Sequence, residues 1–98
     1  VTGNSVVFGA GVFGEDACKR IIGYGKKVDF FIDSDINKHE EKLMNISVYP
    51  VKDILLIGAE IELIVIASFY WGVDMYKQIR KIGYRGKIAF SSTNHILG

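Results

Sequence analysis

The sequence predicts one α/β domain with three layers, in which a mostly parallel sheet of four or five strands carries helices on both faces. Two apolar runs, Val6–Phe8 and Leu63–Ala67, lack polar alternation, as is typical of strands buried on both faces of a parallel sheet. Helix-period segments at 13–22 and 72–82 follow these runs, and a glycine-rich turn joins the first run to its helix. The first strand is expected at the centre of the sheet.

The first strand is expected over 5–9, and the helix that follows over 13–22. Phe13, Ala17 and Ile21 recur at helical spacing and predict the face that packs on the sheet. Cys18 is expected to be a small buried or half-buried packing residue, since no histidine or basic cluster stands near it to activate a thiol.

Between this strand and helix stands a Gly-x-Gly-x-x-Gly turn, Gly9 to Gly14, with Val12 and Phe13 inside it. Gly9 would allow a tight turn, Gly11 would let backbone approach a pyrophosphate, and Gly14 would let the helix lie close to the sheet. The first N–H groups of the helix would then face an anion. The turn therefore predicts a nucleotide site, although a glycine turn beside an empty crevice would have the same sequence.

A second strand is expected over 28–33 and ends in Asp33 and Ser34. Asp33 follows Gly14 at roughly the 20-residue spacing of a ribose-binding acid, and parallel strands bring their carboxyl ends to one edge. Asp33 is thus a candidate acceptor for nucleoside hydroxyls; the alternative is an acidic residue that only begins the next turn. The polar, lysine-rich residues 36–44 predict a short helix or an irregular segment, with His39 solvated.

Further strands are expected at 45–50, as a short edge strand, at 61–67, beside the first strand, and at 87–91. A brief helix is expected over 51–57. Ser68 and Tyr70 follow the 61–67 strand and would form the other side of the crevice, where Tyr70 would contact a base or sugar or, alternatively, pack against the domain. The similar segments around Gly23 and Gly83 both predict left-handed glycine caps followed by a contacting tyrosine.

Composition narrows the class of protein. The 98 residues fit one domain, and a net charge of +1 without a basic stripe argues against nucleic acid and anionic membranes as partners. A single cysteine is typical of a reducing compartment and predicts a cytoplasmic location. The apolar end at Ile96 and Leu97 predicts that residues 1–98 are one domain of a larger protein, whose other domains would be its partners.

The segments Val7–Gly14, Phe31–Asp35, Ile46–Pro50 and Ile64–Ser68, with Tyr70, together resemble the small Rossmann-like domains of bacterial sugar-modifying enzymes. These include the N-terminal domain of sugar-nucleotide acetyltransferases, the related domain of polysaccharide-biosynthesis enzymes, and accessory domains of FkbM-type methyltransferases and glycosyltransferases. The resemblance implies that Gly9, Gly11 and Gly14 hold phosphates of a UDP-sugar or of NAD, with Asp33 near the nucleoside. The catalytic helix of the acetyltransferases has no counterpart here, so the resemblance implies binding without catalysis.

Three alternatives remain open: an NAD-sensing regulatory domain, which would normally form a homodimer, a fragment of an NAD-dependent oxidoreductase, and an interaction domain with a degenerate site. The chain lacks a Tyr-x-x-x-Lys pair, a nucleophile elbow and a spaced metal-ligand set, so neither catalytic nor metal-binding residues are assigned. The ligands considered are sugar nucleotides, NAD(H), NADP(H) and coenzyme A. Asp33 disfavours a phosphate on the adjacent ribose, which makes NADP(H) the least favoured.

Overall fold

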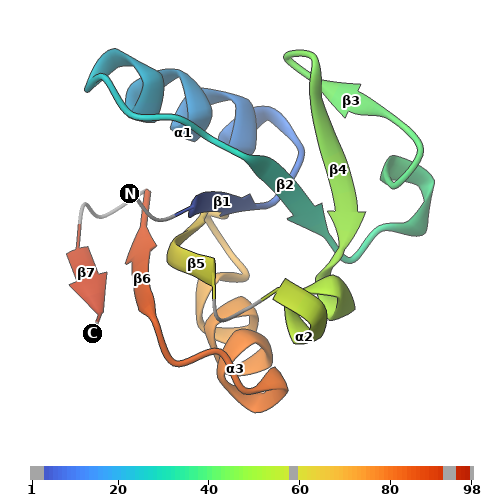
Figure 1. Cartoon of the computed structure of the whole chain (residues 1–98), viewed down its shortest axis with the longest axis vertical. Helices are drawn as coiled ribbons and strands as arrows, with labels where there is room; N and C mark the ends of the chain where they lie inside the picture. Colours follow the sequence, from blue (N-terminus) through green and yellow to red (C-terminus); the bar gives the residue numbers. More distant parts are fainter. Residues whose placement is uncertain (1–3, 58–59, 92–94, 98) are drawn as a thin grey trace.

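The computed structural model describes residues 4–57, 60–91 and 95–97 of the chain (Figure 1). Its sheet has the strand order β3-β4-β2-β1-β5-β6-β7. Five of these strands are mutually parallel: β1 (Asn4–Phe8), β2 (Phe30–Asp33), β4 (Ile46–Pro50), β5 (Ile61–Ile66) and β6 (Lys87–Phe90). Strand β1 lies at the centre between β2 and β5, so the parallel sheet and the position of its first strand are confirmed.

Two short antiparallel strands extend the sheet beyond the expected four or five. Strand β3 (Lys42–Leu43) pairs with β4, which is therefore not the outermost strand, and β7 (His95–Leu97) pairs with β6. Met44 and Asn45 join β3 to β4 with φ values of 54° and 62°. A two-residue turn with positive φ at both positions matches the right-handed twist of the strands that it joins, which explains why a hairpin forms in this polar segment.

Helices cover both faces of the sheet. Helix α1 (Val12–Gly23) lies on one face, and α2 (Ile54–Ile57) and α3 (Gly72–Ile82) lie on the other (Figure 1). A single turn of 3-10 helix, η2 (Val51–Asp53), leads directly into α2, so the expected brief helix over 51–57 is two consecutive short turns. Helices α1 and α3 each return the chain to the opposite end of the sheet, so β2 runs parallel to β1 and β6 runs parallel to β5.

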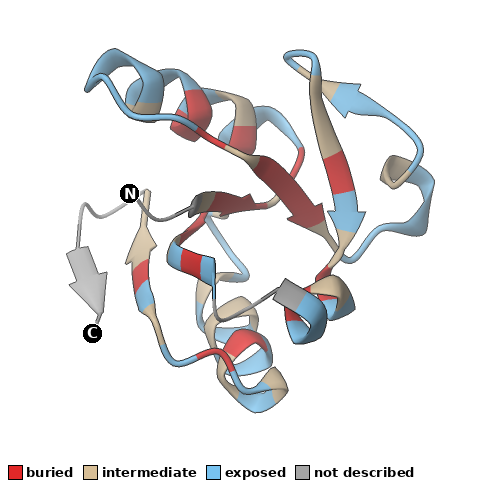
Figure 2. Ribbon diagram, viewed as in Figure 1, coloured by how far each residue is buried: buried red, intermediate tan, exposed pale blue. Residues whose placement is uncertain are grey.

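The core has one cluster on each face of the sheet. Val6 and Phe8 of β1 pack with Ile54 of α2 and Ile79 of α3, whereas Val7 packs on the α1 side. Cys18 lies in this second cluster and is fully buried, as expected, and burial raises the pKa of its thiol. Figure 2 shows this burial along β1 and β2, while the outer side of α1 is exposed. The apolar runs are therefore strands covered on both faces.

The two helix ends that look alike in sequence differ in structure. Gly83 adopts the expected left-handed conformation, with φ of 114°, and Tyr84 behind it is buried. Gly23 is instead the last residue of α1, and Gly25 has the positive φ, 79°. Tyr24 is 85% exposed, so the expected cap at Gly23 with a packed tyrosine is wrong. Gly25 lies two residues after Gly23, and the chain turns at Gly25 instead.

Candidate functional site

The carboxyl ends of the parallel strands meet at one edge of the sheet. The Gly9 N–H donates to the Ile32 carbonyl at 2.8 Å, and the Ala67 N–H donates to the Phe8 carbonyl at 2.9 Å. The Ser91 N–H likewise donates to the Ile66 carbonyl at 3.1 Å. These bonds place the residues that follow β1, β2, β5 and β6 side by side, and open α/β sheets bind ligands at this edge.

Two glycines fix the shape of the turn after β1. Gly9 has φ of +116°, and a Cβ added there would lie 2.7 Å from the Ala67 carbonyl oxygen. A Cβ on Gly14 would overlap the Gly9 carbonyl oxygen, so the first turn of α1 is held directly against the end of β1. Both positions therefore require glycine for close approach of backbone to backbone.

The start of α1 faces open space. Gly11 is the N-cap residue of α1 and gives no side-chain bond to the first turn, and nothing lies within 4 Å of a Cβ built on it. Val12 is 82% exposed and Phe13 is 52% exposed. The first N–H groups of a helix carry partial positive charge and need acceptors, so this end of α1 is suited to an anion.

Asp33 lies beside the glycine turn and bonds to it. Its Oδ2 accepts from the Ala10 N–H at 2.7 Å, and its Oδ1 accepts from the Asp35 N–H at 2.8 Å. Asp33 is half-buried, and Ser34 next to it is exposed. Each carboxylate oxygen can accept a second hydrogen bond, so the carboxylate retains capacity for a ligand hydroxyl while it orders two backbone segments.

Two residues that the sequence did not indicate complete this region. They belong to the turn that contains η1 (Ile36–Lys38), which Asp35 caps by accepting from the Asn37 N–H at 3.0 Å. The Lys38 ammonium donates to the Ala10 carbonyl at 3.2 Å, and His39 Nε2 lies 2.6 Å from the Asp33 carbonyl oxygen. Because a carbonyl can only accept, His39 donates through Nε2. His39 is half-buried and its ring contacts the end of β2, so it is less solvated than expected.

Aromatic side chains gather at the carboxyl end of β5. Phe69 stacks on Phe13 of α1 with ring centroids 6.3 Å apart, and Tyr70 meets Phe69 edge-on at 5.0 Å. Tyr70 remains 81% exposed, so it does not pack into the domain. Ser68 accepts from the Trp71 N–H at 2.9 Å through Oγ and so orders the entry to α3.

A cavity of about 460 Å³ opens beside Asp33, between the ends of β2 and β4. Its walls include Asp33, Ser34, Ile36, His39, Pro50 and Val51. The other walls include both polar and apolar residues. Ile36 is 77% exposed and adds an apolar side chain at the rim of the cavity. The cavity therefore combines apolar walls with the carboxylate residue Asp33, a combination that suits a nucleoside.

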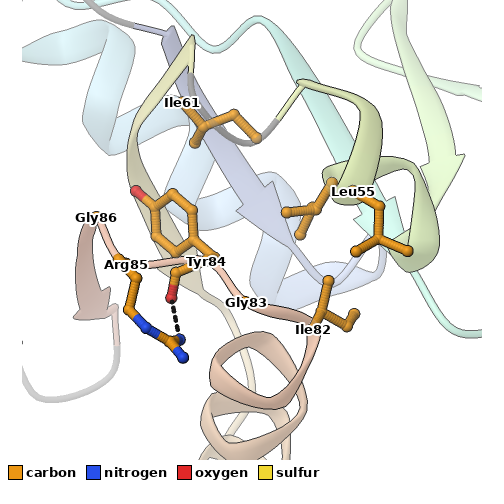
Figure 3. Close-up of a pocket in the computed structure, with 8 residues that line it drawn as sticks. Leu55, Ile61, Ile82, Gly83, Tyr84, Arg85 and Gly86 are labelled. Atoms are coloured by element: carbon orange, nitrogen blue, oxygen red, sulfur yellow. Dashed lines mark hydrogen bonds between the residues drawn. The ribbon is translucent and has the colours of Figure 1, made fainter.

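A second cavity, of about 420 Å³, lies at the opposite edge of the sheet, between α2 and the start of β6 (Figure 3). Leu55, Ile61 and Ile82 provide apolar walls, and the Arg85 guanidinium donates to the Arg80 and Tyr84 carbonyls. Burial raises the pKa of Tyr84 to about 12, an effect that the nearby Arg80 only partly offsets. No residue of the glycine turn or of the Asp33 region lines this cavity.

Within 4–57, 60–91 and 95–97, no group of three His, Cys, Asp or Glu side chains is arranged to hold a metal ion. Among the same residues, no helix has the length and apolar character that crossing a membrane requires.

No protein-family model and no curated protein matches this chain. Solved structures do resemble it. RSP, a Rex-family repressor, matches with a TM-score of 0.72 and 16% identity over 91% of this chain and 44% of that one. RSP in complex with beta-NAD+ and operator DNA matches with a TM-score of 0.66 and 14% identity over 92% of this chain and 50% of that one.

UDP-D-quinovosamine 4-dehydrogenase from Vibrio fischeri matches with a TM-score of 0.67 and 22% identity over 90% of this chain and 78% of that one. The chain spans about half the length of the repressor that it resembles. At these identities the similarity shows the fold alone, and the fold of this chain is Rossmann-like.

Proposed function

We propose that this chain is a nucleotide-binding domain whose preferred ligand is an NAD-type dinucleotide. The observation that carries the proposal is the glycine turn, in which Gly14 brings the start of α1 against the end of β1 and Gly11 leaves that start uncovered. Such a start can receive a diphosphate, because N–H groups and the helix dipole both favour negative charge there. A similarly folded protein, RSP, has been solved with beta-NAD+, which supports this choice.

In this proposal the ligand extends along the carboxyl edge of the sheet. The diphosphate lies on Gly11, Val12 and Phe13, and a ribose hydroxyl donates to the Asp33 carboxylate. The nucleoside base enters the cavity between the ends of β2 and β4, where Ile36 offers an apolar contact. The other half of the dinucleotide lies near Ser68 and Tyr70, and the exposed ring of Tyr70 supplies a stacking surface.

The domain binds without performing catalysis. Each of its best-placed polar groups is already engaged with backbone: Asp33 with Ala10 and Asp35, Ser68 with Trp71, and His39 with Asp33. Such groups position a ligand and order the edge of the sheet. Chemistry would then belong to other domains of a parent protein.

A second candidate ligand is a sugar nucleotide such as a UDP-sugar, with the parent protein acting on bacterial glycans. The specific observation in its favour is the fold of UDP-D-quinovosamine 4-dehydrogenase, of which this chain matches 78%. The same glycine turn and Asp33 would hold its diphosphate and ribose. If the ligand is instead a dinucleotide, the candidate role is an NAD-sensing regulator, because the repressor RSP has a similar fold.

Two further points remain predictions: that the domain does not bind nucleic acid, and that it is cytoplasmic.

A ligand panel and one substitution test the proposal. Calorimetric titration with NADH, NAD+, NADPH, UDP-glucose and coenzyme A should give the tightest binding for NADH or NAD+. Gly11→Val should abolish that binding, because a branched side chain would occupy the approach of the diphosphate. The fold should be retained, since a Cβ at Gly11 meets nothing within 4 Å and φ is −110°.

Gly23→Val is the matched control at the other end of α1, where a Cβ also meets nothing within 4 Å. It should leave affinity unchanged. Undiminished binding in Gly11→Val would remove the glycine turn from the site. Tighter binding of UDP-glucose than of NADH would favour the sugar-nucleotide candidate.

A further inference from the structure

Lys38 differs from every other lysine in the part of the chain that the structure describes. The others are exposed, whereas Lys38 is half-buried. Lys19 and Lys27 form ion pairs with Glu15 and Asp29, but no carboxylate among the described residues lies within 4 Å of the Lys38 ammonium. The ammonium is therefore held on a backbone carbonyl with no carboxylate of those residues beside it, and this position needs an explanation.

The explanation lies in what surrounds the ammonium. Lys38 Nζ donates to the Ala10 carbonyl at 3.2 Å, directly before the N-cap residue of α1. Asp33 accepts from the N–H of the same Ala10. The end of β2 and the segment after it therefore bond to both the N–H and the carbonyl of Ala10 in the glycine turn. An ammonium has three donors, and the carbonyl uses one of them. Two donors and the whole positive charge remain beside the uncovered start of α1.

We infer that Lys38 is a specificity-determining residue of the nucleotide site, whose ammonium pairs with a phosphate of the bound ligand. The inference rests on the proposed function and extends it. Backbone N–H groups alone provide partial charges, and a phosphate that also meets Lys38 gains a charge-assisted hydrogen bond. The ligand class is therefore a nucleotide with a phosphate next to Ala10, in preference to an uncharged nucleoside.

That phosphate has two sources with the same chemistry: the bridging diphosphate of NADH, or the additional phosphate on the ribose of NADPH. Lys38 adjoins both proposed positions, because Ala10 belongs to the glycine turn and Asp33, which bonds to Ala10, is the proposed ribose acceptor. Measuring both ligands separates them.

The test is calorimetric titration of NADH and NADPH into the wild-type chain, Lys38→Gln, Lys38→Arg and the control Lys26→Gln at several salt concentrations. Lys26 is exposed in the loop that leads into β2, and its substitution changes the net charge equally. Lys38→Gln should weaken binding roughly tenfold or more, and Lys38→Arg should retain most of the affinity. Lys26→Gln should bind as the wild type does. Affinity should also depend less on salt in Lys38→Gln, since one charge contact is gone.

Equal weakening of both ligands assigns Lys38 to the diphosphate, and a larger loss for NADPH assigns it to the ribose phosphate; each supports the inference. Unchanged affinity in Lys38→Gln overturns it. So does a loss that arginine does not rescue and that leaves the salt dependence unchanged, because Lys38 would then only hold the turn. A wild-type chain that binds no member of the wider nucleotide panel contradicts the proposed function itself, which distinguishes the two failures.

Discussion

At the scale of single residues, Asp33 joins segments that are far apart in the sequence. Its position beside the glycine turn could be predicted, because the end of β2 and the end of β1 are neighbours in any parallel sheet of this order. Its bonds to the Ala10 and Asp35 N–H groups could not, since they depend on how the turn after β2 folds back. Asp33 therefore orders the fold of this edge in addition to its proposed role in binding.

Replacing Asp33 with Asn should weaken both folding and binding. The amide keeps one oxygen acceptor but presents an NH₂ group to the other backbone N–H, so one charge-assisted bond is lost. We expect the free energy of unfolding to fall by about 1–2 kcal/mol, and dinucleotide affinity to fall by one to two orders of magnitude. Denaturant unfolding and calorimetric titration measure the two effects separately.

Asp35→Asn is the control for this substitution, because it removes the same charge two residues away and Asp35 accepts only from the Asn37 N–H. It should have the smaller effect on both measurements. Full stability of Asp33→Asn would show that the bond to Ala10 contributes nothing to the fold.

At the scale of elements, secondary structure could be predicted where a sequence pattern extends over many residues. Apolar runs identified β1, β2 and β5, and helical periodicity gave α3 its observed bounds. The strand β3 and the turn η1 have only two and three residues, too few to show a period. Their structure comes from local backbone geometry, as at Met44 and Asn45, and from contacts with distant segments, as at Lys38.

The contact of α1 with β1 gives a prediction for the whole helix. Gly14→Ala should lower the free energy of unfolding by more than about 3 kcal/mol, because its Cβ would overlap the Gly9 carbonyl and α1 would have to move off the sheet. Gly11→Ala, three residues earlier, should cost less than about 1 kcal/mol, as its Cβ meets nothing. Denaturant unfolding of the pair is the measurement, and similar losses in both variants would contradict the close approach.

At the scale of the whole molecule, stability should fall in alkaline solution through Tyr84. The pKa of this hydroxyl is about 12 in the folded protein, against an ordinary value of 10.0, because burial favours the neutral form. Between pH 10 and pH 12 the unfolded chain releases the proton while the folded protein keeps it. The free energy of unfolding therefore decreases across this interval, by roughly 2 kcal/mol in total.

Tyr84→Phe isolates this contribution, since phenylalanine keeps the ring and does not titrate. It also loses the bond from the Tyr84 hydroxyl to the Lys87 carbonyl, so the variant should be less stable at neutral pH. The gap in unfolding free energy between wild type and variant should narrow as pH rises from 10 to 12. A gap that stays constant would mean that Tyr84 has the same pKa in both states.

The central place of β1 has a consequence for the order in which the protein is made. The glycine turn leaves the ribosome before β5 does, yet β1 pairs on one side with β5, and Gly9 lies against the Ala67 carbonyl. A nascent chain that ends before residue 67 contains the whole glycine motif but lacks the Ala67 carbonyl, against which Gly9 packs in the folded protein. Competence to bind a nucleotide should therefore appear late and abruptly during synthesis, when β5 enters the sheet, and bound ligand would report a completed fold.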